Sequence, residues 1–209
     1  MYITRIMLKR LPTPNNIHGI LSAAFPGKRS DQINESLWRV DNLGDSRALI
    51  VVSKNSPDTQ YIVSKIGIND QKCSAKNNNA DLHKTLNYEP FLKRIESGQM
   101  WNFRLCANPV EHKKQNLSDK RGKIYALRTV EEQLEWLDRQ SIKYGFNVKG
   151  GSVIGDSWIA FNKVRIRAVT FDGLLAVTNA EAFRLALTQG IGRGKAYGCG
   201  LLTVAKVQT

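Results

Sequence analysis

The chain has 209 residues, of which 42% are hydrophobic and 23% charged; this ordinary globular composition excludes a wholly disordered or low-complexity protein. Its 31 lysines and arginines outnumber 18 aspartates and glutamates, which gives a net charge of +13. A surplus of this size favours a polyanionic partner, either nucleic acid or an anionic membrane surface.

The first half of the chain predicts a run of six elements. Mixed β-branched and polar residues indicate strands, and an apolar stripe at helical spacing over 17–24 indicates a helix. Asn15 or Asn16 is expected to cap this helix, because an asparagine side chain accepts hydrogen bonds from the free N–H groups of the first turn. In chain order the elements are a strand over 2–9, the capped helix, strands over 36–42 and 47–54, a short helix over 90–95 and a strand over 99–107.

The second half repeats the helix-strand-strand-helix-strand order after an opening strand near 123–127. Thr129 and Glu132 have the form of a capping box, and the helix that they open carries Val130, Leu134 and Leu137 on one face. The later elements are two or three strands over 146–154, 158–171 and 174–178, a helix over 180–187 capped by Asn179, and a final strand over 201–205.

This order predicts an α+β protein of two tandem ferredoxin-like (βαββαβ) domains with antiparallel sheets. The first domain is expected over residues 1–108 and the second over 123–209, with a basic linker or loop over 109–122 between them. From Arg139 onward ten basic residues stand against three acidic ones, so the positive field is expected to be stronger in the second half.

Membrane and metal-bound classes are disfavoured. No stretch approaches the roughly 18 uninterrupted apolar residues of a membrane span, and Arg5 and Lys9 interrupt the apolar start of the chain, unlike a signal peptide. The three cysteines have no CxxC spacing, which argues against a disulfide framework or a zinc site. We therefore expect a cytoplasmic protein with no metal, no other cofactor and no membrane partner.

One histidine is a candidate for proton transfer. His18 falls in the first turn of the first predicted helix, beside its apolar stripe. A helix N-terminus attracts anions, and an imidazole near a phosphate can take or give a proton. RNA supplies its own nucleophile, the 2′-hydroxyl, so a ribonuclease without a metal needs in-line geometry, a proton donor or acceptor, and cations for the developing charge. A solvated or packing histidine gives the same pattern.

Two basic segments are candidate phosphate contacts. Lys163, Arg165 and Arg167 alternate with apolar residues, which on a strand puts the three cations on one face. A glycine-rich segment further on carries Arg193 and Lys195, and its glycines permit positive φ and close approach of a phosphate to peptide N–H groups. A solvated sheet face and a loop of tight turns are the alternatives that give these patterns.

Several strings together resemble one protein family. They are MYITRIML at the start, a histidine in the first helix followed by FPG, FRLCANP (103–109), VEEQLEWL (130–137), AVTFDGLLAVT (168–178) and GIGRGKAYGCGLLTVA (190–205). Over its whole length the chain resembles the CasE family, the CRISPR-associated repeat endoribonucleases of type I-E systems.

The resemblance implies tandem ferredoxin-like domains and cleavage of CRISPR precursor RNA at the base of each repeat stem-loop, without a metal. The 2′-hydroxyl attacks, a cyclic phosphate and a 5′-hydroxyl result, and the enzyme keeps its product as a subunit of Cascade. The implied partners are thus the repeat RNA stem-loop and other Cascade subunits. The family's catalytic histidine falls on His18 and its groove-entering hairpin near 155–167, with Lys163 as the nearest counterpart of a hairpin lysine. The remaining expected RNA contacts are Lys28, Arg29, Arg104, Lys113 and Lys114.

The sequence departs from the family at one position of consequence. Well-known members carry a tyrosine three residues before the histidine, and here that position is Asn15. An amide is not a proton donor of similar acidity, so its help must be positional or come from elsewhere, with Tyr197 as a candidate. A non-catalytic scaffold that binds an RNA hairpin is therefore the alternative function.

Overall fold

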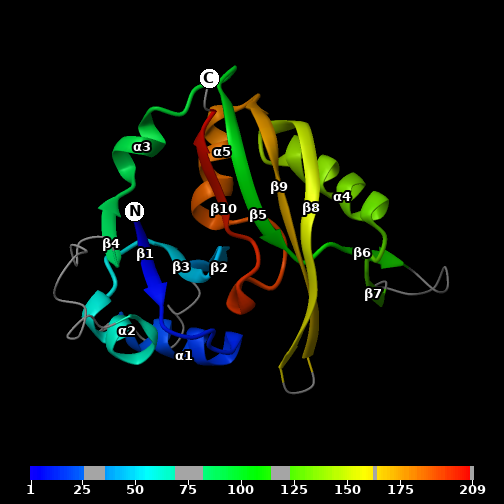
Figure 1. Cartoon of the computed structure of the whole chain (residues 1–209). Coiled ribbons are helices and arrows are strands. Elements are labelled where there is room, and N and C mark those ends of the chain that lie inside the picture. The colour runs from blue at the N-terminus through cyan, green and yellow to red at the C-terminus, as the bar shows by residue number, and fades with distance from the viewer. Residues whose placement is uncertain (26–35, 69–81, 114–122, 162–163, 208–209) are drawn as a thin grey trace. The chain divides into compact units, whose positions relative to one another are not determined.

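The computed structural model describes residues 1–25, 36–68, 82–113, 123–161 and 164–207. It divides into two compact units, shown with their elements in Figure 1. The first unit comprises Met1–Arg94 and Lys195–Gly198, and the second comprises Ile95–Gly194 and Cys199–Thr209. Among the described residues, no helix is both long enough and apolar enough to cross a membrane.

The first unit has a four-stranded antiparallel sheet in the order β2-β3-β1-β4. Its elements are β1 (Tyr2–Leu8), α1 (Pro14–Ala23), β2 (Ser36–Leu43), β3 (Ser46–Ser53), α2 (Thr59–Ile66), β4 (His83–Asn87) and the short α3 (Glu89–Lys93). Helices α1 and α2 lie side by side (Figure 1). Their apolar faces share one core with β1, β2 and β3, which includes Ile17, Leu21, Ile62 and Ile66. This is a complete βαββαβ unit, as predicted for the fold class.

The start of α1 differs from the prediction. The cap is Thr13, whose hydroxyl accepts a hydrogen bond from the Asn16 N–H at 3.3 Å, and Pro14 follows as the first helical residue. Proline suits that position because its fixed φ is helical and it has no N–H to leave unpaired. The prediction of Asn15 or Asn16 as cap is therefore wrong, and His18 lies in the second turn of α1 rather than in the first.

The second unit repeats the topology, with sheet order β10-β5-β9-β8, all antiparallel. Its elements are β5 (Met100–Ala107), β6 (Val110–Lys113), β7 (Lys123–Ala126), α4 (Val130–Lys143), β8 (Phe146–Phe161), β9 (Val164–Val177), α5 (Ala180–Gln189) and β10 (Leu202–Lys206). Strands β6 and β7 form a separate two-stranded ribbon. Helix α4 contacts β8 and helix α5 contacts β10.

The division between the units corrects the sequence analysis. The strand predicted over 99–107 exists as β5, but it pairs with β9 and β10 and so opens the second sheet. The compact units separate after Arg94, not after 108. The strand expected near 123–127 is β7, which pairs with β6 and takes no part in the four-stranded sheet. Two elements that were not predicted, α2 and β4, complete the first unit instead.

Both helix caps predicted in the second unit are confirmed. Thr129 and Glu132 form the reciprocal capping box of α4, with hydrogen bonds of 3.2 and 3.1 Å. The Asn179 side chain accepts from the Ala182 N–H at 3.0 Å. The predicted apolar face of α4 is wrong in part, because Val130 is exposed. The side chains that it buries are Gln133, Trp136, Leu137 and Ser141.

A long hairpin replaces the two or three strands predicted between 146 and 178. Strand β8 continues to Phe161, with register shifts between 148 and 150 and between 153 and 155, and β9 starts at Val164, so the strand predicted over 158–171 spans parts of two different strands and is wrong. Strand β5 accompanies β9 only as far as Val169. Among the described residues, 157–161 and 164–168 therefore pair only with each other, as a ribbon that extends beyond the four-stranded sheet (Figure 1). We call this ribbon the outer hairpin.

Candidate nucleic-acid interface

The histidine proposed for proton transfer lies on α1 of the first unit and is half-buried. Helix α1 contacts η3, a single 3₁₀ turn over Lys195–Tyr197 that belongs to this same unit. The fold thus brings Lys195 and Tyr197, from the far end of the sequence, to the helix that carries His18. Partial burial lowers the pKa of Lys195, because the charged ammonium group loses solvation.

Glycines hold η3 in place. The five glycines of the segment at 190, 192, 194, 198 and 200 all have positive φ, which confirms the tight turns that the sequence suggested. Gly198 has φ +86°, and a Cβ there would lie 2.7 Å from the nearest ring carbon of Trp38. The bare glycine therefore lets the chain pass directly against the Trp38 ring of β2.

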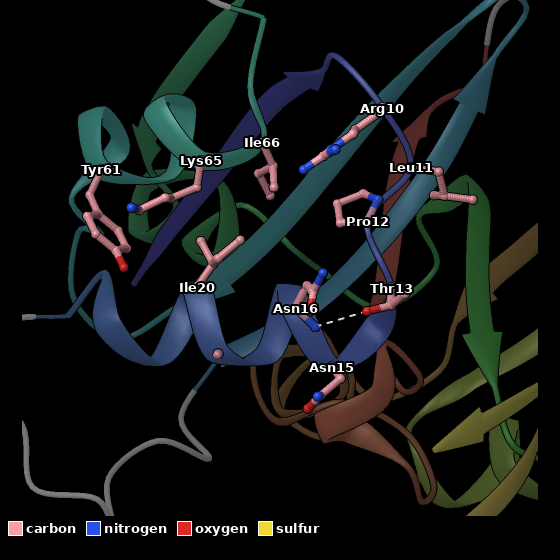
Figure 2. A pocket seen from close by; sticks show the side chains of 11 residues that line it. Arg10, Leu11, Pro12, Thr13, Asn15, Asn16, Ile20, Tyr61, Lys65 and Ile66 are labelled. Carbon is pink, nitrogen blue, oxygen red and sulfur yellow. Dashed lines mark hydrogen bonds between the residues drawn. The ribbon is translucent and has the colours of Figure 1, made fainter. Parts of the chain in front are cut away.

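A pocket of about 700 Å³ opens on another side of α1, between that helix, α2 and the loop that follows β1 (Figure 2). Asn15 and Asn16 line it, whereas His18 does not. Its charged lining residues, Arg10 and Lys65, are both basic, and Lys65 lies 5.5 Å from the centre of the Tyr61 ring. Asn15 thus borders a pocket whose described charged residues are both basic.

The second unit has a different basic cluster, on the outer hairpin. The guanidinium groups of Arg165 and Arg167 lie 5.1 and 5.6 Å from the centre of the Trp158 ring. These three residues and Arg128 line a pocket of about 460 Å³. Trp158 is 46% exposed, and Ile166, between the two arginines, is buried. The predicted alternation of basic and apolar side chains is thus confirmed for residues 165 to 167.

The two arginines differ in what holds them. Arg167 donates two hydrogen bonds to the Asp156 carboxylate, at 2.7 and 2.5 Å, and one to the Arg128 carbonyl at 3.2 Å. The buried Gln133 side chain donates to the same carboxylate at 3.0 Å. Hydrogen bonds from Arg167, and to a smaller extent from Gln133, lower the pKa of Asp156. Arg165 is exposed and has no carboxylate partner among the residues described.

The other predicted RNA contacts are dispersed. Arg104 of β5 forms a two-point ion pair with Asp172 of β9, at 2.6 and 2.5 Å, so its charge is compensated. Arg193 is exposed in the second unit, and Lys113 ends β6. The remaining candidates lie outside the described residues: Lys28, Arg29, Lys114 and Lys163.

Sequence reasoning missed Trp158, Arg128, Asp156 and Gln133. The register pairs Trp158 of β8 with Arg167 of β9, whereas the prediction placed both residues in one strand. In the described part of the chain, histidine, cysteine and acidic side chains form no group of three or more that is suited to a metal ion.

The comparison with known families covers almost the whole chain. The family of CRISPR associated proteins matches residues 1–206. The chain belongs to this family. The resemblance noted in the sequence is thereby confirmed.

Individual members of the CRISPR associated family agree with this assignment. The chain is 25% identical to the CRISPR-associated endoribonuclease Cse3 of Thermus thermophilus, over 98% of this chain and 100% of that relative. It is also 25% identical to the CRISPR system Cascade subunit CasE of Escherichia coli, over 98% of this chain and 99% of that relative. The structure of the CRISPR endoribonuclease Cse3 bound to a 19-nucleotide RNA superimposes with a TM-score of 0.74, at 25% identity and 98% coverage of both chains.

Proposed function

We propose that this protein is a metal-independent endoribonuclease that cleaves CRISPR precursor RNA at the base of the repeat stem-loop. It then retains the processed RNA as a subunit of Cascade in the cytoplasm. The observation that carries this proposal is similarity over the whole chain to Cse3, which is named an endoribonuclease, and to CasE, which is named a Cascade subunit. The net charge of +13 supports a polyanionic substrate.

The proposed reaction needs no external nucleophile. The 2′-hydroxyl oxygen attacks the neighbouring phosphorus, a bond from that oxygen to phosphorus forms, and the bond from phosphorus to the 5′-oxygen breaks. One group removes the 2′-proton and another protonates the leaving 5′-oxygen, which yields a cyclic phosphate and a 5′-hydroxyl. His18 performs one of these transfers. Lys195 and Lys163 are the proposed cations for the charge on the phosphorane, and the contact of η3 with α1 supports the choice of Lys195.

The test compares His18→Ala with His112→Ala, an exposed histidine on β6 that serves as matched control. The substrate is a stem-loop RNA from the CRISPR repeat of the source genome. A positioned acid or base contributes about 10²- to 10⁴-fold, so His18→Ala should slow cleavage by that factor and change the RNA Kd by less than about tenfold. The control should cleave as wild type does. Near wild-type cleavage by His18→Ala would contradict the catalytic role.

Two further measurements test the chemistry. A 2′-deoxy substitution at the cut should abolish cleavage, because it removes the nucleophile. Excess EDTA should leave the rate unchanged, whereas a loss of activity that added Mg²⁺ restores would contradict metal independence.

A non-catalytic RNA-hairpin scaffold is the second candidate function, and Asn15 is the observation that favours it. The wild-type protein would then bind the repeat stem-loop without cutting it, with or without the 2′-hydroxyl. Cleavage of the unmodified RNA alone would reject the scaffold.

A further inference from the structure

The outer hairpin carries an aromatic side chain that no step of the proposed cleavage uses. Trp158 lies directly opposite Arg167 in the ribbon where β8 and β9 pair only with each other. Its ring is 46% exposed, whereas Trp38 and Trp136 are 4% and 5% exposed. The indole is large and nearly half of it is exposed to solvent. Such a ring is suited to burial against a flat apolar surface of a ligand.

The surroundings of this ring are organised in the absence of ligand. The Gln133 side chain is buried and binds Asp156, Asp156 binds Arg167 through two hydrogen bonds, and Arg167 lies over the Trp158 ring. The Arg167 side of the indole is therefore already fixed before a ligand stacks on the ring, which reduces the entropy lost on binding.

The charge of the pocket identifies the class of ligand. Among the described residues, three arginines line it and two carboxylates act on them: Asp156 is paired with Arg167, and Glu132 also acts on Arg167, which leaves a surplus of one positive charge. An aromatic face beside guanidinium groups is the combination by which proteins bind a nucleotide, with the base on the ring and the phosphate on the cations. The pocket volume of about 460 Å³ is in the range of sites for small ligands.

We propose that this pocket, formed by Trp158, Arg128, Arg165 and Arg167, binds one unpaired nucleotide of the RNA. The base stacks on Trp158, and Arg128 and Arg165 bind the adjoining phosphate. The inference rests on the proposed function in taking RNA as the ligand, and it adds a site that reads a single-stranded position.

The nucleotide is unpaired for a physical reason. A base inside a stem has neighbouring bases on both faces, so it offers no free face to an indole unless it is extruded, whereas an unpaired base does. Arg165 is exposed and is held over the ring only by the cation–π contact that the structure records. An entering base replaces the Arg165 guanidinium on the indole and frees that cation for the phosphate. Arg167 stays in place, because Asp156 holds it.

The experiment is a double-mutant cycle between protein and RNA. Every protein carries His18→Ala, which keeps the RNA intact, and Kd is measured for a repeat stem-loop and for stem-loops in which each unpaired nucleotide in turn is abasic. Stacking of one base contributes about 5- to 150-fold in affinity. We expect Trp158→Ala to weaken binding of the intact RNA by that factor, and Trp158→Phe to restore most of it. At one abasic position, Trp158→Ala should cause no further loss.

Two controls separate stacking from general effects. Ile154→Ala removes another exposed apolar side chain of β8, 52% exposed, and should leave the Kd unchanged. A blunt-ended stem without unpaired nucleotides should bind with the same Kd to the His18→Ala protein and to the protein that also carries Trp158→Ala. Thermal melting of each variant verifies that it folds.

The outcomes are distinguishable. Two results would show that the nucleotide pocket is wrong while the proposed function stands. In the first, the His18→Ala protein binds the repeat RNA and the added Trp158→Ala change leaves the Kd unchanged. In the second, the loss of affinity from Trp158→Ala adds to the loss from the abasic site at every unpaired position. Weakened binding of the blunt stem by Trp158→Ala would overturn the unpaired-nucleotide inference in favour of stem contact. Absence of any binding to the repeat RNA would overturn the proposed function, and this inference with it.

Discussion

Gly198→Ala adds one methyl group where the first unit has no room for it. The backbone has φ +86°, and the new Cβ would lie 2.7 and 2.9 Å from two ring carbons of Trp38, which is 4% exposed. Carbon atoms in contact are normally about 3.5–4.0 Å apart, so the ring or η3 must move by about 1 Å. Overpacking of this kind costs about 1–3 kcal/mol, and an L-residue with left-handed backbone costs about 1–2 kcal/mol. We expect the free energy of unfolding to fall by about 2–5 kcal/mol.

The measurement is urea unfolding followed by tryptophan fluorescence, with Gly44→Ala as matched control. Gly44 also has positive φ, +63°, but a Cβ there would meet nothing within 4 Å. The control should therefore lose only the backbone term of about 1–2 kcal/mol. Cleavage of the repeat RNA should fall in Gly198→Ala and not in the control, because η3 carries Lys195. Equal destabilisation of the two variants would refute the argument that the Trp38 ring excludes a side chain at 198.

Three further predictions concern other parts of the molecule. Gly19→Ala, inside α1 with open space around its Cβ, should raise the free energy of unfolding by about 0.5–1 kcal/mol in the same urea assay; a loss would contradict the open environment. The lowered pKa of Asp156 means that its stabilising effect is present above its ordinary value of 3.8 and is lost as pH falls through the lower folded value. Thermal melting between pH 5 and pH 2 should therefore show a smaller acid-induced loss for Asp156→Asn than for wild type, and identical profiles would reject the pair as a source of acid sensitivity. Arg165→Ala should reduce the slope of log K against log salt for RNA binding by about 0.7–0.9, whereas Arg139→Ala, on α4, should leave the slope unchanged; equal slopes for Arg165→Ala and wild type would exclude its phosphate contact.

The sequence was informative where structure is decided locally. The capping box of Thr129 and Glu132, the Asn179 cap and the opening strand β1 depend on residues within a few positions of one another, and all three were predicted correctly. The cap of α1 was predicted at Asn15 or Asn16, because asparagine is a common capping residue, but the cap is Thr13. Pro14, which follows Thr13, is the local signal for this position, because proline is common as the first residue of a helix.

The assignment of strands to sheets failed because pairing is not local. Strand β5 pairs Arg104 with Asp172, and nothing near residue 104 in the sequence specifies that partner. Helix α2 has only eight residues and β4 only five, so the periodic pattern of apolar residues in each is too short to identify the element within a polar stretch. The candidate site shows the same limit: Arg167 was predicted as a phosphate contact, yet its cross-strand neighbours Asp156 and Trp158 hold it within the hairpin.

The membership of Lys195–Gly198 in the first unit has a consequence for how the protein is made. Synthesis proceeds from the N-terminus, so α1 leaves the ribosome long before η3 has been translated. A nascent chain, or one that has lost its C-terminal segment to proteolysis, has His18 but not the lysine proposed to neutralise the phosphorane. If Lys195 acts as proposed, a chain whose synthesis has not yet reached η3 does not cleave the repeat RNA.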